Sequence, residues 1–257
     1  MPNASEIAAR LRVPLPVTVL DAVDSTNLEA RRIADAGDLT PRVIIARRQT
    51  GGRGRLGRSF HSPSGGLYLS ILLRPTGTDA GHLTTAAAVA VSRAVDRLTG
   101  RTSGIKWVND VYLDGRKVCG ILTEAKFAGA SLAYAVVGIG VNVVAPEEGF
   151  PADIAGKAGA LFASGAAPSG AMSALAADII GEFLALADAP ASAYLDEYRA
   201  KSVVLGRDVD VARVHDGASR RATALAIDDS LALVVRYDDG TVEAVSAGEV
   251  SLRLGQG

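Results

Sequence analysis

The chain has 257 residues, 48% of them hydrophobic and 21% charged, and a formal net charge of −1. This length and composition predict a globular protein with one large domain and room for a small second one. The near-neutral charge argues against a surface devoted as a whole to nucleic acid or anionic membrane. Because Cys119 is the single cysteine, a disulfide within the chain and a cysteine-based metal cluster are excluded. We therefore expect no built-in metal site.

The N-terminal segment and the longest apolar stretch carry no targeting or membrane signal. Residues 1–12 lack the apolar run that a signal peptide needs. The longest apolar stretch begins at Leu132 and ends at Ala145, but it is interrupted by Asn142 and, at about 14 residues, is too short to cross a bilayer. We therefore expect a cytoplasmic protein that does not contact membranes.

The first part of the chain alternates short apolar runs with amphipathic segments. Strands are predicted over residues 17–23, 43–46 and 67–73, and helices over residues 26–36 and 84–98. Thr26 and Glu29 have the spacing of a capping box, and Thr84 or Thr85 can cap the second helix. Gly37 is a natural end for the first helix. The polar segment of about 20 residues between the second and third strands is long for a compact domain, and such loops are commonly functional.

The middle of the chain continues with a predicted hairpin and two more helices. The runs expected to be strands are residues 105–108, 111–113, 118–122 and 133–143. Asp114-Gly115 supplies the turn of the hairpin. Residues 172–186 form a strongly apolar predicted helix, and residues 191–199 form a shorter one.

After Lys201 the pattern changes to short strand-like runs. These cover residues 209–214, 221–227, 231–236 and 242–245, with turn signals at Asp216-Gly217, Asp228-Asp229 and Asp239-Gly240. Short strands with regular turns over about 55 residues predict a small β-barrel. We therefore divide the chain into a domain of residues 1–202 and a domain of residues 203–257.

Residues 51–58, Gly-Gly-Arg-Gly-Arg-Leu-Gly-Arg, are the strongest charge anomaly of the chain. Six of the 17 residues from Arg42 to Arg58 are arginine and none is acidic. Glycines let the backbone approach a ligand closely, and arginines supply donors suited to phosphate or carboxylate. The segment lacks the Gly-Lys-Ser/Thr end of a Walker A loop, and no clear helix follows as in a dinucleotide-binding loop. On composition alone it is an anion-binding loop or a basic surface loop that contacts RNA.

A second group of polar residues lies in the predicted hairpin. Residues 106–122 hold two of the five lysines of the chain, Lys106 and Lys117. A hairpin that brings Asn109 close to both lysines would place two cations and an amide around one anionic group. The alternative is a strand pair whose lysines are merely solvated.

A third group interrupts the apolar run of residues 133–143. Gly138 and Gly140 stand inside this predicted strand, and glycines there usually mark a place where a ligand or another backbone comes close. Asn142 is a polar residue in the same run and needs a hydrogen-bond partner if it is buried. A structural network and a ligand contact are equally compatible with it.

Five motifs in one order resemble the family of biotin–protein ligases. They are Asp24-Ser25-Thr26-Asn27, Gln49 with Gly52-Arg53-Gly54-Arg55-x-Gly57-Arg58, Lys106-Trp107-x-Asn109-Asp110, Arg116-Lys117-x-x-Gly120-Ile121-Leu122 and Gly138-Ile139-Gly140-x-Asn142. The segment of residues 248–253, which ends the small C-terminal domain, is similar to that of the family as well. The resemblance covers nearly the whole chain from about Val17 onward.

The resemblance implies both a fold and a reaction. The fold is an α/β (α+β) catalytic domain with a mixed β-sheet related to class II synthetases, followed by an SH3-like barrel. In the reaction, biotin and ATP with Mg²⁺ give biotinyl-5′-AMP and pyrophosphate. The biotinyl group then passes to a lysine on the biotin carboxyl carrier domain of an acyl-CoA carboxylase. A monomer and a homodimer are both compatible with the resemblance.

The resemblance also assigns roles to residues by their position in the motifs. The residues expected to bind biotin are Ser25, Thr26, Asn27, Gln49, Arg53, Gly54, Arg55 and Lys117. Those expected to bind ATP or the adenylate are Arg53, Arg55, Arg58, Phe60, Lys106, Asn109, Asp110 and Asn142. Lys117 and Arg53 are the expected catalytic residues, with Lys117 between the biotin carboxylate and the α-phosphate.

Two positions depart from the pattern of the family. The family usually has proline where Val108 stands, and it often has tryptophan near the adenine where Phe60 stands. Because phenylalanine can still stack on a base, we expect a change in nucleotide affinity rather than a loss of activity.

Three other functions fit parts of the pattern. Some family members are repressors with an N-terminal winged helix-turn-helix of about 60 residues, but the first motif begins at Asp24, so we expect no DNA binding. A lipoate or octanoate ligase or transferase shares the fold, but the Gly-Arg-Gly-Arg loop and the Lys-Trp-x-Asn-Asp motif favour biotin. An RNA-binding module would leave Lys117 and Asn142 unexplained.

Overall fold

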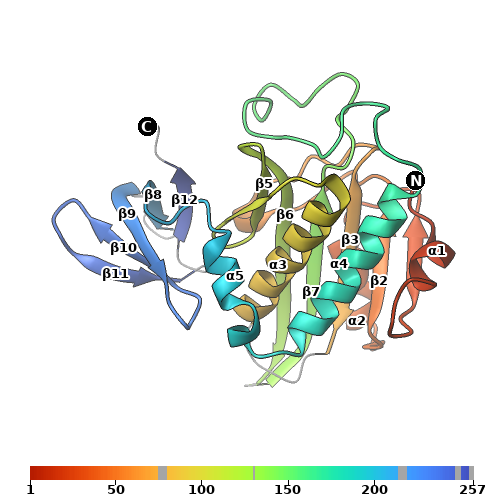
Figure 1. Cartoon of the computed structure of the whole chain (residues 1–257). Helices are drawn as coiled ribbons and strands as arrows, with labels where there is room; N and C mark the ends of the chain where they lie inside the picture. The colour runs from red at the N-terminus through yellow and green to blue at the C-terminus, as the bar shows by residue number, and fades with distance from the viewer. Residues whose placement is uncertain (75–79, 130, 214–218, 247–249, 255–257) are drawn as a thin grey trace.

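The computed structural model describes residues 1–74, 80–129, 131–213, 219–246 and 250–254. These residues form two units: an α/β body on a seven-stranded sheet and a smaller five-stranded sheet beside it (Figure 1). The prediction of a mixed-sheet domain followed by a small β-domain is therefore confirmed. Within these ranges, no helix is long and apolar enough to cross a membrane.

The large sheet combines strands from the whole first part of the chain. In spatial order they are β1 (Val17–Leu20), β2 (Arg42–Ala46), β3 (Leu67–Leu73), β7 (Ser131–Val141), β6 (Arg116–Ala128), β5 (Asp110–Leu113) and β4 (Gly104–Lys106). β1 and β2 are parallel, and every other neighbouring pair is antiparallel. The sheet is thus mixed, and the largely apolar strands β3 and β7 lie near its centre.

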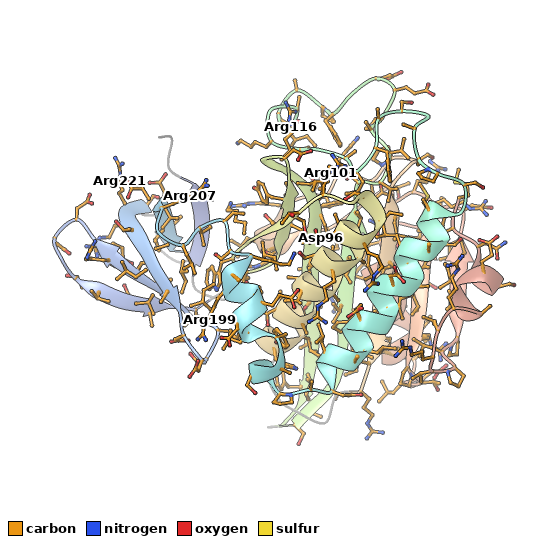
Figure 2. The ribbon with its side chains drawn as sticks, viewed as in Figure 1. Asp96, Arg101, Arg116, Arg199, Arg207 and Arg221 are labelled. Carbon is orange, nitrogen blue, oxygen red and sulfur yellow. The ribbon has the colours of Figure 1, made fainter. Side chains whose placement is uncertain are left out.

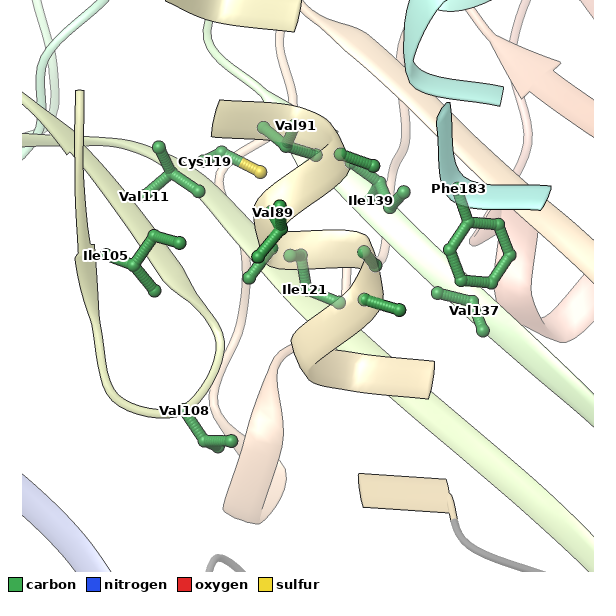
Figure 3. Close-up of a cluster of buried hydrophobic side chains, with 14 of the residues drawn as sticks. Val89, Val91, Ile105, Val108, Val111, Cys119, Ile121, Val137, Ile139 and Phe183 are labelled. Atoms are coloured by element: carbon green, nitrogen blue, oxygen red, sulfur yellow. The ribbon is translucent and has the colours of Figure 1, made fainter. Parts of the chain in front are cut away.

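Helices cover the two faces of this sheet unequally. The helices α3 (Ala80–Thr99) and α4 (Ala171–Ala187) lie side by side across one face (Figure 1). Their side chains, such as Val89 and Phe183, pack against Ile121, Val137 and Ile139 of the sheet (Figure 3). The short helix α2 (Thr26–Asp35) packs on the opposite face. An additional helix, α1 (Ala4–Ala8), was not predicted and buries Ile7 completely.

Two predicted helix caps are wrong. The N-cap of α2 is Ser25, and the hydroxyl of Thr26 donates instead to Gln49 Oε1 at 3.2 Å. Helix α3 begins at Ala80, so Thr84 and Thr85 lie inside it. The hydroxyl of Thr85 donates to a backbone carbonyl of the preceding turn. The hydroxyls that the sequence predicts as helix caps, those of Thr26 and Thr85, therefore bind other partners: a distant side chain in α2 and a carbonyl of the preceding turn in α3.

The second sheet has the strand order β11-β10-β9-β8-β12 and is antiparallel throughout. The strands are β8 (Asp208–Arg213), β9 (Ser219–Ile227), β10 (Leu233–Tyr237), β11 (Val242–Val245) and β12 (Val250–Leu254). The predicted turns at Asp228-Asp229 and Asp239-Gly240 lie between strands, whereas Asp216-Gly217 falls outside the described residues. No ladder between β11 and β12 closes this sheet into a barrel in the part of the chain that the structure describes.

Hydrogen bonds join the two units at the turn that follows β9. Arg199 of α5 (Leu195–Ala200) donates to Ile227 O at 2.8 Å and pairs with Asp229 at 2.7 Å. Figure 2 shows Arg199 between α5 and the second sheet. The indole N–H of Trp107 donates to Leu231 O at 3.0 Å in a buried contact. The smaller sheet is therefore attached directly to the segment that carries Lys106.

A glycine of β7 determines how closely α2 approaches the sheet. Gly138 lies opposite Ser70 of β3 in the ladder. A Cβ on Gly138 would lie 2.1 Å from Asn27 Oδ1, and real Cβ atoms are not found so close to another heavy atom. The Asn27 amide instead lies on the bare backbone and accepts a hydrogen bond from Ser70 Oγ at 2.6 Å.

We expect Gly138→Ala to destabilise the protein by about 1–3 kcal/mol, because the added methyl group overpacks a full site. Gly181→Ala in α4 is the matched control, since a Cβ there meets no atom within 4 Å. A glycine-to-alanine change inside a helix should stabilise by about 0.5–1 kcal/mol. Urea unfolding of the two variants should therefore give shifts of opposite sign. A Gly138→Ala variant as stable as the unmodified chain would contradict the packing argument.

Candidate functional site

The open face of the sheet is bare where three strands meet. Tyr68, Gly140 and Gly120 form one row across β3, β7 and β6. A Cβ on Gly140 would lie 2.6 Å from Phe60 Cε1, and one on Gly120 would lie 3.1 Å from Phe60 Cε2. The ring of Phe60 therefore lies directly on the backbone of the two glycines, and it meets the ring of Tyr68 edge to face with 6.4 Å between centroids.

A chain of hydrogen bonds arranges polar groups beside this bare patch. Gln49 Oε1 accepts from the backbone N–H of Thr26 at 2.8 Å, and Gln49 Nε2 donates to Ser62 Oγ at 2.9 Å. Ser62 in turn donates to Phe60 O at 2.9 Å. The buried Ser70 hydroxyl lies 2.7 Å from Thr26 Oγ1. The amide and hydroxyl orientations are therefore set by partners in the protein before any ligand arrives.

These groups enclose a small pocket, which we call the inner pocket, with a volume of about 310 Å³. Its walls combine neutral polar side chains, one arginine, two aromatic rings and sheet backbone. The lining residues are Ser25, Thr26, Asn27, Gln49, Arg53, Phe60, Tyr68, Leu69, Gly120, Leu122, Gly138, Ile139 and Gly140. The chemistry of the walls suits a compact ligand with its own amide-like donors and acceptors.

The glycine- and arginine-rich segment forms a short hairpin at the mouth of the inner pocket. Phe60 N donates to Gly52 O at 2.9 Å, and Gly54 N donates to Arg58 O at 2.7 Å. Between these bonds, the backbones of Arg53 and Ser59 pair in an antiparallel β-bridge. A Cβ on Gly52 would lie 2.3 Å from Phe60 O. The hairpin therefore requires glycine at position 52.

A larger pocket of about 730 Å³, which we call the basic pocket, adjoins the inner pocket. The two share Arg53, Phe60, Gly120 and Leu122. The basic pocket is lined by Arg53, Gly54, Arg55, Leu56, Arg58, Ser59, Phe60, Lys106, Trp107, Asn109, Asp110, Lys117, Gly120, Ile121 and Leu122. Five of these lining residues are cationic and one is a carboxylate, so the pocket favours a multiply charged anion.

Burial leaves two of the cations poorly solvated. Burial lowers the pKa of Lys106, Asp110 opposes this shift, and the positive charges of Lys117 and Arg58 add to it. Burial also lowers the pKa of Arg55, again against the effect of Asp110. Because burial disfavours the charged forms of both side chains, an anion bound in this pocket would stabilise them.

Lys117 stands where the two pockets meet. Its Nζ lies 2.6 Å from Asp110 Oδ1, and it lies only 3.3 Å from the position of a Cβ on Gly120. Asn109 is held by its Nδ2, which donates to Ile121 O at 2.7 Å, and its Oδ1 accepts from Arg55 at 3.3 Å. The structure thus brings the lysine hairpin and the arginine loop around one space.

The predicted site residues divide between the pockets. Of the residues expected to bind biotin, the inner pocket has Ser25, Thr26, Asn27, Gln49 and Arg53, whereas the basic pocket has Gly54, Arg55 and Lys117 as well as Arg53. Of those expected to bind ATP, the basic pocket has Arg53, Arg55, Arg58, Phe60, Lys106, Asn109 and Asp110.

Asn142 lines neither pocket. Its Nδ2 donates to Gly159 O at 2.9 Å and its backbone N–H donates to Val118 O at 2.8 Å. It thereby ties the long connection between β7 and α4 to the edge of the site, while Lys117 N donates to Lys157 O in the same connection at 2.8 Å. These hydrogen bonds support a structural role for Asn142. Its contact with nucleotide remains a prediction.

Three polar residues of the site were not predicted from the sequence: Ser70, Ser62 and Glu124. Ser70 is a polar residue within the apolar run of β3, and that interruption was an available signal. Glu124 receives hydrogen bonds from Asn27 and Arg53, but its local sequence does not mark it. Across the described residues, no group of three or more His, Cys, Asp or Glu side chains is placed to hold a metal ion.

Comparison with known proteins matches both units to one family. A sequence model of the Biotin/lipoate A/B protein ligase family matches residues 20–142, and a model of the Biotin protein ligase C terminal domain matches residues 204–253. Among solved structures, biotin protein ligase from Aquifex aeolicus in complex with biotin and ATP is similar with a TM-score of 0.76 and 26% identity. The match covers 93% of this chain and 99% of that one.

Curated relatives agree with these matches. This chain is 40% identical over 136 residues to biotin--[acetyl-CoA-carboxylase] ligase of Paracoccus denitrificans, which covers 51% of the chain and 56% of that relative. For the bifunctional ligase/repressor BirA of Bacillus subtilis the match is 35% identical and covers 52% of this chain and 42% of the relative. The chain therefore spans about half the length of these two relatives. The match to biotin--[acetyl-CoA-carboxylase] ligase of Mycobacterium tuberculosis is 33% identical and covers 90% of this chain and 87% of the relative. By this match and the fold, the chain belongs to the biotin protein ligase family.

Proposed function

We propose that this protein is an ATP-dependent biotin–protein ligase. The observation that carries the proposal is the junction of the two pockets at Phe60, Gly120 and Lys117, where a pocket lined mostly by neutral polar groups meets one lined by five cations. The inner pocket suits the fused ring of biotin, which offers amide-like donors and acceptors on a compact apolar body. The basic pocket suits the phosphates of ATP. The carboxylate of biotin and the α-phosphate of ATP would then meet at the junction.

The first reaction joins these two anions. A carboxylate oxygen of biotin attacks the α-phosphorus, the bond between the α-phosphorus and the bridging oxygen breaks, and pyrophosphate leaves. Fixed cations are needed because negative charge accumulates at this point in the transition state. Lys117 stands at the junction and exchanges its contact with Asp110 for the reacting groups, and Arg53 closes the pocket from the other side.

The second reaction transfers the biotinyl group from the adenylate to an acceptor. The amine of an acceptor lysine attacks the acyl carbon and loses a proton to solvent, and AMP leaves with the electrons of the broken bond between the acyl carbon and the phosphate oxygen. Until then the mixed anhydride has to be protected from water. The hairpin of residues 52–60 lines both pockets and would be the part of the site that does this.

The acceptor is the biotin carboxyl carrier domain of an acyl-CoA carboxylase, and the reaction takes place in the cytoplasm. Mg²⁺ arrives with ATP, and Asp110 is the lining carboxylate that would contact it. Residues 1–202 form the catalytic domain and residues 203–257 the C-terminal domain.

The purified protein should catalyse biotin-dependent exchange between ATP and pyrophosphate. The same assay with lipoate should give no exchange, because the polar groups of the inner pocket would lack partners on the lipoate ring. The measurement is the incorporation of labelled pyrophosphate into ATP with biotin and lipoate side by side. Exchange with lipoate but not with biotin would assign the protein to the lipoate branch of the family.

Lys117→Ala should reduce exchange by a factor of about 10²–10³, the usual effect of removing one fixed donor from a transition state. Lys126→Ala is the matched control, since Lys126 lies on the same strand and pairs with Asp35, away from both pockets. Both variants should unfold cooperatively in urea. Near-normal exchange by Lys117→Ala would remove Lys117 from the reaction.

Arg53→Gly should release the activated acyl group into solution, because Arg53 borders both pockets. With biotin and ATP present, we expect biotin to appear on unrelated proteins in the same solution, detected by streptavidin blotting. The unmodified chain provides the reference for the extent of labelling. Tight retention of the adenylate by Arg53→Gly would show that the arginine does not hold it.

A further inference from the structure

One carboxylate connects the floor of the inner pocket with its rim. Glu124 lies on β6, and its side chain is 18% exposed. Its Oε1 accepts hydrogen bonds from Arg31 NH1 at 2.9 Å and from Arg53 NH1 at 3.1 Å. Its Oε2 accepts from Asn27 Nδ2 at 2.9 Å. Asn27 and Arg53 line the inner pocket, whereas Glu124 itself does not.

The orientation of the Asn27 amide depends on this carboxylate. Asn27 Oδ1 accepts from Ser70 at 2.6 Å, and Nδ2 donates to Glu124 and, at 3.2 Å, to Leu122 O. A flipped amide would turn its oxygen toward two acceptors, the Leu122 carbonyl and the Glu124 carboxylate. The Asn27 amide already lies against the backbone of Gly138, so it has no room to move closer to the sheet. A flipped amide therefore could not move away from these two acceptors in that direction.

The position of Arg53 depends on the same carboxylate. Arg53 lies on a hairpin of glycines and arginines, and its side chain is 41% exposed. An exposed arginine on such a loop would otherwise have many rotamers, and ordering one costs free energy. Arg31, one helical turn after Asn27, also binds Glu124 and so holds the carboxylate in place from α2.

We propose that Glu124 is a positioning residue that sets the Asn27 amide in the floor of the inner pocket and the Arg53 guanidinium on its rim. The inference rests on the proposed function, since it concerns how the same pocket holds biotin and its adenylate. Glu124 acts through Asn27 on the binding of the ligand. It acts through Arg53 on the retention of the product of the first reaction.

Glutamine at this position cannot replace glutamate. Both carboxylate oxygens of Glu124 act as acceptors. Oε1 accepts from two guanidinium groups, and Oε2 accepts from an amide. A glutamine side chain presents one oxygen and one NH₂ group. In either orientation its NH₂ faces a donor, so Glu124→Gln loses the contact with Asn27 or the contacts with both arginines. The change therefore tests positioning with almost no change of volume.

The experiment compares Glu124→Gln with the unmodified chain. We expect the KM for biotin in the exchange assay to rise about tenfold, as for loss of a buried hydrogen-bond partner. At saturating biotin, kcat should stay within about threefold, because Lys117 and the cations of the basic pocket other than Arg53 keep their contacts. The release of biotinyl-5′-AMP, followed after dilution, should become about tenfold faster.

Glu182→Gln is the matched control. Glu182 lies on α4, across the sheet from the inner pocket, with a side chain 25% exposed. It likewise accepts from two arginines, Arg93 at 3.0 Å and Arg97 at 2.9 Å. Its loss should lower stability without changing KM for biotin or adenylate release. If the KM for biotin and the rate of adenylate release changed equally in the Glu124 and Glu182 variants, the cause would be a general loss of stability. That result would overturn the inference.

An Arg53→Met background separates the two actions of Glu124. Adding Glu124→Gln there should still raise the KM for biotin through Asn27, but it should speed adenylate release by less than about twofold further. If Glu124→Gln does not fold, Glu124→Asp, which keeps the charge on a shorter side chain, should change KM and release in the same directions by smaller factors. Unchanged KM and release in the folded variant would overturn the inference while leaving exchange, and hence the proposed function, intact. Absence of biotin-dependent exchange in the unmodified chain would instead contradict the proposed function.

Discussion

In the middle of the seven-stranded sheet, one face has hydrogen atoms where side chains would otherwise stand. Gly120, Gly138 and Gly140 lie on neighbouring strands, and a Cβ on any of them would collide with or crowd Phe60, Asn27 or Lys117. Glycine weakens a strand because it adds chain entropy to the unfolded state and packs nothing. The sheet tolerates this because its other face is covered by α3 and α4. The bare patch therefore depends on the core behind it.

The basic pocket has a comparable relation to stability. Arg55 and Lys106 are buried enough that their pKa values are lowered, because burial disfavours their charged forms. An anion bound beside them would favour those charged forms. The same burial would thus contribute to affinity where negative charge accumulates. Neutral replacements there would trade ligand binding for stability.

The sequence was sufficient to predict most of the elements and much of the site. Strands β2 and β3 and helix α4 follow from apolar runs of the right length, and the glycines of β7 were conspicuous in such a run. The capping box of Thr26 failed because its hydroxyl binds Gln49 and Ser70, which are 23 and 44 residues away. Glu124 could not be predicted for the same reason, because its partners are also distant in the sequence. Its partners become neighbours only when α2, β6 and the arginine hairpin meet on the sheet.

The smaller sheet affects the site through its contact with Trp107. Trp107 follows Lys106 directly, lines the basic pocket, and donates its indole N–H to Leu231 O in the turn between β9 and β10. Tyr198 of α5 donates to Val108 O at 3.1 Å, so both sides of this segment are fixed from outside the large sheet. A buried carbonyl that lost its donor would remain unsatisfied. Movement of the second sheet would therefore displace the backbone that carries Lys106, and the C-terminal unit contributes to the geometry of the anion site without lining it.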